Sequence, residues 1–235
     1  MRALSDSDVI DLWENGVQRH PVDRALLTLG AAHPEVPHAA LADWPLGRRN
    51  QAIAELRAAS FGHGIHGWIA CPGCGDRLEF EIDWRALAAA GSDSRPDQLV
   101  VAGGRRFRLP TSRDLAAIAQ EADPHLAAIR LADNCLAEPD GSAAWSEQEL
   151  EEIGDRMAQA DPLAETRLTL DCPSCFNAWE ESLDIAAFLW EEIEARARRI
   201  IFEIHSLASA YGWTEPQILA LSPSRRALYL EMVHA

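Results

Sequence analysis

Two pairs of cysteines give the clearest chemical signal in the sequence. Cys71 and Cys74 are separated by Pro-Gly, and Cys172 and Cys175 are separated by Pro-Ser. The two thiolates of such a turn can face one cation, and two turns complete the tetrahedron of ligands that zinc prefers. Proline favours the turn, and Gly75 after the first pair allows the backbone to approach the metal closely. The four cysteines therefore predict one structural Zn²⁺ per chain.

The residues alone leave other interpretations of the cysteine pairs open. The pairs could be reduced and metal-free or redox-active, although a redox pair normally begins a helix and these pairs lie between predicted strands. His63 and His66 precede the first pair and could supply a ligand or a second site, but we expect loop residues there. The fifth cysteine, Cys135, lies in a helical pattern and is expected to be a buried thiol.

The residues around each pair alternate between apolar and polar types, as β-strands do. The segments GWIA and RLEFEIDW flank the first pair, and RLTL and NAWEESLDI flank the second. This doubled pattern resembles a zinc ribbon that is split between residues 67–90 and 165–185. About 97 residues, 75–171, lie between the pairs, where ~15–20 is common. Phe176 also departs from the ribbon pattern, because a glycine usually follows the knuckle.

The long segment between the two halves has structural signals of its own. We expect residues 91–164 to form an inserted subdomain. Gly103 and Gly104 mark the turn of a hairpin, and Thr111 and Ser146 each begin a capping box at the start of a helix.

Both ends of the chain are predicted to be helical. In residues 1–66 the first helix begins at a capping box on Ser5, and residues 186–235 carry apolar residues at helical spacing. The predicted fold class is α+β: a zinc-ribbon β core interrupted by a long inserted subdomain, with helical N-terminal and C-terminal segments.

The composition disfavours several classes of function. The formal net charge is −16 and the pI is about 4.8, so most of the surface would repel the phosphates of a nucleic acid. We expect a cytoplasmic protein, because no leader pattern and no apolar run of about 18 residues is present. Phosphate-binding loops, GxSxG and HExxH are also absent. These features predict a protein that is not an enzyme.

The last fifty residues contain a second specific pattern. After a long helix, Gly212 and Trp213 precede a short helix that Thr214 caps, and Pro223 begins another helix. This segment could simply be a compact helical subdomain. We also consider it a surface for a protein partner, with the following candidate residues: Trp213, Ile218, Leu219, Arg225, Arg226 and Tyr229.

The same segment resembles a module of small proteins that are encoded with contractile phage tails and phage-tail-like injection systems. Three further stretches resemble that setting: PLGRRNQAIAELRAASFG, CPGCGDRLEFEID and FRLPTSRDL. Together they are similar to baseplate proteins of the T4-like baseplate hub assembly chaperone group. The resemblance implies a non-enzymatic chaperone for a hub subunit, or a structural component of the baseplate, with tail or hub proteins as partners. The lack of a long apolar run separately predicts no membrane association.

A zinc-ribbon module of a nucleic-acid-binding or transcription-related protein is the alternative. Two local groups of arginines favour it: Arg105, Arg106 and Arg108 in the insertion, and Arg196, Arg198 and Arg199 near the C-terminus. The acidic charge of the whole chain argues against it. The sequence leaves the oligomeric state open.

Overall fold

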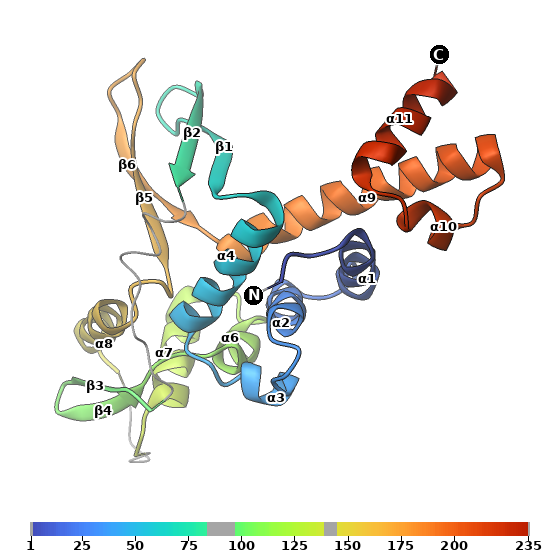
Figure 1. Cartoon of the computed structure of the whole chain (residues 1–235). Helices are drawn as coiled ribbons and strands as arrows, with labels where there is room; N and C mark the ends of the chain where they lie inside the picture. Colours follow the sequence, from blue (N-terminus) through green and yellow to red (C-terminus); the bar gives the residue numbers. More distant parts are fainter. Residues whose placement is uncertain (1, 84–96, 139–144, 235) are drawn as a thin grey trace.

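The computed structural model describes residues 2–83, 97–138 and 145–234. The chain is a mixed structure of helices and small antiparallel hairpins, compatible with the α+β class (Figure 1). In chain order the elements are α1 (Asp6–Gly16), α2 (Pro21–Ala32), α3 (His38–Leu41), α4 (Leu46–Phe61), β1 (Gly64–Ala70), β2 (Arg77–Asp83), β3 (Leu99–Ala102), β4 (Arg105–Arg108), α6 (Ser112–Ile118), α7 (Pro124–Cys135), α8 (Glu147–Ala160), β5 (Thr166–Asp171), β6 (Ala178–Leu183), α9 (Ile185–Tyr211), α10 (Glu215–Leu219) and α11 (Pro223–His234).

The main hydrophobic core joins the two ends of the chain. Helix α9 is 27 residues long and packs against α1, α2 and α4 with one apolar face. Fully buried side chains from these helices form the centre of the core: Val9, Leu29, Ile53, Leu56, Leu189 and Ile193. The N-terminal helices and the first half of α9 therefore form one body.

Each cysteine pair lies at the turn of a two-stranded hairpin. Strand β1 pairs with β2 in antiparallel register, and β5 pairs with β6 in the same way, in two separate sheets. Strand β1 begins at Gly64, earlier than the expected Gly67. Residues 84–90 of the expected ribbon lie outside the described residues.

The inserted segment has a second core. Hairpin β3–β4 turns at Gly103 and Gly104, whose φ angles are positive as the turn requires. Phe107 of β4 is fully buried in the same apolar cluster as Cys135 of α7 and Ile153 of α8. The predicted hairpin and the predicted buried thiol are confirmed.

Hydrogen bonds attach the insertion to the start of α4. The Gly47 N–H donates to the Asp161 carboxylate over 2.8 Å, and the Asn50 amide donates to the Leu163 carbonyl over 2.8 Å. A Cβ at residue 47 would collide with Asp161 at 1.8 Å. Only glycine fits this junction without a displacement of Asp161.

The predicted capping boxes are present at the helix starts. Ser5 with Asp8, Thr111 with Asp114, and Ser146 with Glu149 each exchange side-chain and backbone hydrogen bonds. These contacts satisfy amide groups that would otherwise lack partners.

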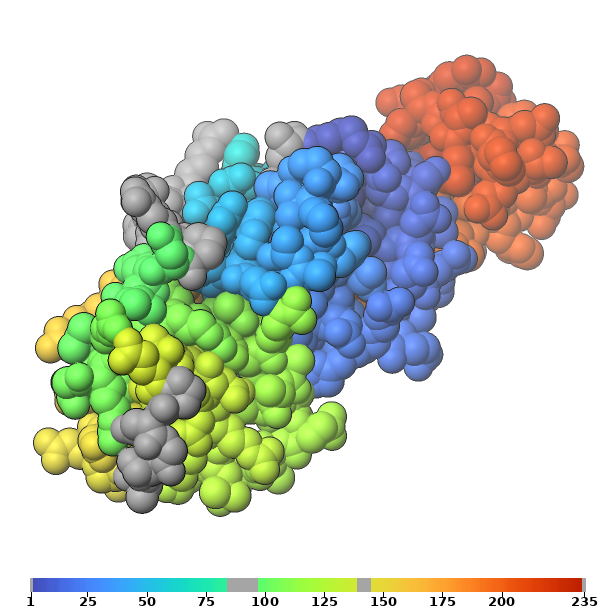
Figure 2. Space-filling model, turned by 90° about the horizontal axis from the view of Figure 1, so that it is seen from below, coloured from blue at the N-terminus to red at the C-terminus, as the bar shows by residue number. Residues whose placement is uncertain are grey.

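The C-terminal helices form a lobe at one end of the molecule, and the insertion lies at the opposite end (Figure 2). Arg226 of α11 forms ion pairs with Asp6 of α1 and Glu203 of α9. Arg196 also binds Asp6 at 2.7 Å. This network joins the last helix to the first. In the part of the chain that the structure describes, no helix has both the length and the apolar content that a membrane crossing requires.

Candidate metal centre

The first half-site is a tight backbone turn at the end of β1. The Cys71 N–H donates to the Asp76 carbonyl over 2.8 Å, and the Gly75 N–H donates to the Cys71 carbonyl over 2.8 Å. The Gly73 N–H lies 3.3 Å from the Cys71 sulfur and donates to it. Gly75 has a φ of +80°, which glycine adopts without strain. These bonds hold the Cys71 sulfur where a metal would bind.

The second half-site repeats this turn with a less suitable residue. The Cys172 N–H donates to the Asn177 carbonyl and the Phe176 N–H donates to the Cys172 carbonyl, each over 2.9 Å. Phe176 has a φ of +59°, and it is the one non-glycine residue with a positive φ among those described. Its side chain is 87% exposed. Phe176 therefore adopts the conformation of a knuckle glycine at an energetic cost.

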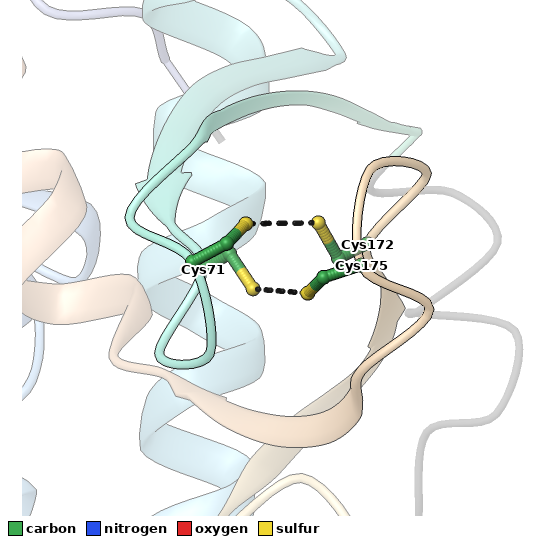
Figure 3. Close-up of side chains that lie close together, drawn as sticks. Cys71, Cys172 and Cys175 are labelled. Carbon is green, nitrogen blue, oxygen red and sulfur yellow. Dashed lines mark hydrogen bonds between the residues drawn. The ribbon is translucent and has the colours of Figure 1, made fainter.

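The two turns bring all four sulfur atoms within 4.8 Å of one another. Two contacts join one half-site to the other: the sulfurs lie 3.6 Å apart for Cys71 and Cys175, and 3.6 Å apart for Cys74 and Cys172 (Figure 3). A disulfide needs about 2.05 Å, so the sulfurs are not bonded to each other. Four sulfurs at about 2.3 Å from one zinc ion lie about 3.8 Å apart. The cluster therefore has the dimensions of a four-sulfur metal site.

Burial and ionisation differ among the four thiols. Cys71 and Cys172 are buried, whereas Cys74 and Cys175 are exposed. Hydrogen bonds from the backbone N–H groups of Cys175 and Ser174 lower the pKa of Cys172 to about 7, against the effect of burial. The pKa of Cys74 is raised to about 12: the Asp76 N–H lowers it, but burial and the neighbouring thiols raise it more. The cluster therefore forms one thiolate readily, whereas the ionisation of further thiols beside it is disfavoured. A bound cation would offset this repulsion between thiolates.

Other thiols and imidazoles lie apart from the cluster. His63 and His66 are exposed, and neither belongs to the metal-ligand group formed by described residues. His66 lies 3.8 Å from Glu81 on the neighbouring strand. Burial raises the pKa of Cys135 to about 12, so this thiol is not ionised near neutral pH.

The six candidate partner residues have unequal exposure. Ile218 is fully buried, and Arg226 is 4% exposed within its ion-pair network. Trp213 stacks on Tyr211 with ring centroids 4.7 Å apart and contacts Tyr229 edge to face at 4.9 Å. Leu219 is half-buried, and Arg225 is exposed. In this conformation Ile218 and Arg226 stabilise the C-terminal lobe and are inaccessible to a partner.

Sequence patterns did not reveal several buried charged contacts. Arg57, which is 2% exposed, donates to both carboxylate oxygens of Glu192 at 2.9 and 2.7 Å. This pair joins α4 to α9 across 135 positions of the chain. An arginine in a predicted helix is ordinarily expected on the solvent-exposed face. The sequence therefore did not predict that Arg57 pairs with Glu192, because this contact depends on how α4 packs against α9.

Comparison with known proteins gave no match: no family model matches the chain, and no curated protein or solved structure is significantly similar to it.

Proposed function

We propose that Cys71, Cys74, Cys172 and Cys175 bind one structural Zn²⁺, which clamps hairpins β1–β2 and β5–β6 into a split zinc ribbon. The observation that carries this proposal is the pairing of sulfurs from different half-sites at 3.6 Å. When bound, the ion supplies charge neutralisation and a tetrahedral link between the hairpins. The backbone N–H groups of the two turns orient the thiolates, as the Gly73 N–H does for Cys71.

A site with four protein sulfurs leaves no coordination position for water or substrate. The metal would therefore stabilise the fold without taking part in a reaction. In a cytosolic protein, as we expect this one to be, the thiols would stay reduced and available to zinc. We infer a non-enzymatic protein whose function lies in contacts with other proteins.

We further propose that these contacts belong to the assembly of a contractile phage tail-like particle, either as a chaperone for a baseplate hub subunit or as a component of the baseplate. The support is the sequence resemblance of the C-terminal segment and of three other stretches. The partly exposed aromatic cluster of Tyr211, Trp213 and Tyr229 offers a surface for a protein partner. Arg225, exposed beside it, adds a charged contact.

The biological part of the proposal is tested in the native host. Deletion of the gene should leave tube and sheath proteins present but no complete baseplate, as seen by electron microscopy of particle preparations. Restoring the wild-type gene should recover the particles. Intact and functional particles in the deletion strain would contradict a role in baseplate assembly.

The metal part is tested on the purified protein with a matched pair of variants. Cys172→Ser should lose zinc in metal analysis, whereas Cys135→Ser should retain one zinc per chain, because Cys135 lies in the separate core of the insertion. Equal zinc content in both variants would exclude the proposed ligand set. This result would not bear on the host experiment, so the two parts of the proposal can fail separately.

Nucleic-acid binding is the second candidate, and the pairing of the arginines argues against it. All six arginines of the two local groups lie within 4 Å of an Asp or Glu oxygen: Arg105, Arg106, Arg108, Arg196, Arg198 and Arg199. A phosphate would have to compete with these carboxylates on a chain of net charge −16. DNA or RNA affinity that falls steeply with salt would favour this candidate over the first.

A further inference from the structure

A buried arginine in the main body has no anionic partner among the residues that the structure describes. Arg49 of α4 is 6% exposed, and its guanidinium donates only to neutral oxygens: Asn50 Oδ1 at 3.0 and 2.9 Å, and Ser112 Oγ at 3.3 Å. Among the described residues, no carboxylate lies within 4 Å of it. These three bonds use three of the five N–H donors of a guanidinium. The charge is therefore buried and incompletely compensated.

The other buried arginines of the described residues, in contrast to Arg49, have carboxylate partners. Arg57 is bound by Glu192, and Arg226 is bound by Asp6 and Glu203. An unpaired buried charge is strongly destabilising. Burial accordingly lowers the pKa of Arg49, an effect that the more distant Asp184 partly opposes. An anion next to Arg49 would remove this penalty.

Arg49 lines a cavity of about 300 Å³, between the starts of α2 and α9 and next to α4 and α6. The Trp190 side chain lines the same cavity. The indole Nε1 of Trp190 is buried and makes no hydrogen bond, and the residue is 4% exposed. Because the Trp190 Nε1 has no accessible surface, Arg49 is the donor that the described residues leave for a ligand in this cavity.

The remaining lining of this cavity is apolar in part and acidic at one side. Val22 and Leu115 supply apolar surface. Arg24 also lines the cavity, but it donates to the carbonyls of Gly16 and Val17 and lies over the Trp190 ring. These contacts favour a ligand that carries both an acceptor group and an apolar group.

Three carboxylates in the lining limit the charge of such a ligand. Asp184 accepts the Ala186 and Ala187 N–H groups at the start of α9, and Glu194 forms an ion pair with Arg198. Glu191 also lines the cavity. Their combined negative charge would repel a polyanion more than a singly charged group.

We propose that this cavity binds a small, singly charged carboxylate that carries an apolar group, with the carboxylate on the Arg49 guanidinium and the apolar group against Val22 and Leu115. The volume is at the lower limit of small-molecule sites. The same chemistry could come from a free organic acid or from the carboxylate end of a peptide. The proposal does not depend on zinc or on a role in tail assembly.

Thermal unfolding in the presence of defined probes tests this proposal. Benzoate and isobutyrate, at about five times their dissociation constants, should raise Tm by about 2–4 °C, whereas benzamide and isobutyramide should not. Inorganic phosphate should have a weaker effect than either acid. A short peptide ending in a free phenylalanine carboxylate, with its amidated form as the control, distinguishes a chain terminus from a free acid.

Two neighbouring arginines provide matched variants. Arg49→Met should abolish the shift with benzoate, whereas Arg48→Met should preserve it, since Arg48 stacks on Trp44 at 3.8 Å and does not line the cavity. In the wild-type protein, the assigned indole NMR signal of Trp190 should move when benzoate is added. The proposal is refuted if no acid or acid-terminated peptide shifts Tm, or if the shift survives in Arg49→Met.

Discussion

Replacing Phe176 by glycine should stabilise the protein, although the substitution removes a large apolar side chain. Phe176 has a φ of +59°, which costs an ordinary L-residue about 1–2 kcal/mol. Its side chain is 87% exposed, so the ring contributes only about 0.2–0.4 kcal/mol of burial. Glycine also loses about 0.5–1 kcal/mol more backbone entropy on folding. The balance is a stabilisation of about 0.5 kcal/mol.

Gly75 provides the reciprocal variant because it occupies the same position in the first half-site. Its φ is +80°, and a Cβ added there would meet nothing within 4 Å. Gly75→Ala therefore changes backbone preference without a collision, and it should destabilise the protein by about 0.5–1 kcal/mol. If the change in the free energy of unfolding has opposite signs in the two variants, the cause is the backbone conformation. If any substitution in the turns were harmful, both variants would lose stability.

The assay is urea unfolding of both variants and the wild type at one fixed excess of free zinc, because metal binding shifts apparent stability. The midpoint should rise for Phe176→Gly and fall for Gly75→Ala, with unchanged slopes. A loss of stability in Phe176→Gly as large as that in Gly75→Ala would refute the reasoning. The Phe176 ring would then have a stabilising contact that outweighs its backbone strain.

Three further predictions concern charged and buried residues. Arg57→Met should lower the free energy of unfolding by about 2–4 kcal/mol by leaving the partly exposed Glu192 unpaired, and Arg57→Met with Glu192→Leu should recover part of this loss in the same urea assay. Burial alone would raise the pKa of Asp6, but hydrogen bonds from Arg226 and Arg196 lower it overall. Its stabilising contribution should therefore be present above about pH 4 and be lost as pH falls through the lowered pKa; Asp6→Asn should flatten that acid limb in pH-dependent unfolding. Cys135→Ala should cost about 1 kcal/mol in thermal unfolding while the zinc content stays unchanged.

Local sequence signals predicted the local structure well. The capping residues Ser5, Thr111 and Ser146 start helices as expected, because a cap depends on residues three positions apart. Alternating polarity identified the two hairpins, and Gly103 with Gly104 identified the third. The two CxxC pairs predicted that the four cysteines lie together, because this spacing of thiols is typical of a four-sulfur metal site.

Long-range packing was not predictable from the same signals. Nothing near Asp6 or Arg226 in the sequence indicates that they meet across 220 positions of the chain. The start and length of α9 were predicted, but no local signal indicated that its first half completes the core of the N-terminal helices. Arg49 had no sequence signal, because its importance depends on which described side chains lie within 4 Å of it once the chain is folded.

We propose that one zinc ion joins four cysteines from two distant hairpins. X-ray absorption at the zinc edge of the purified protein tests it most directly, since this measurement reports the type, number and distance of the ligands around the metal. We expect one zinc per chain surrounded by four sulfur atoms at about 2.3 Å. A first shell that contains nitrogen or oxygen, or a protein that is purified fully folded without zinc, would contradict it.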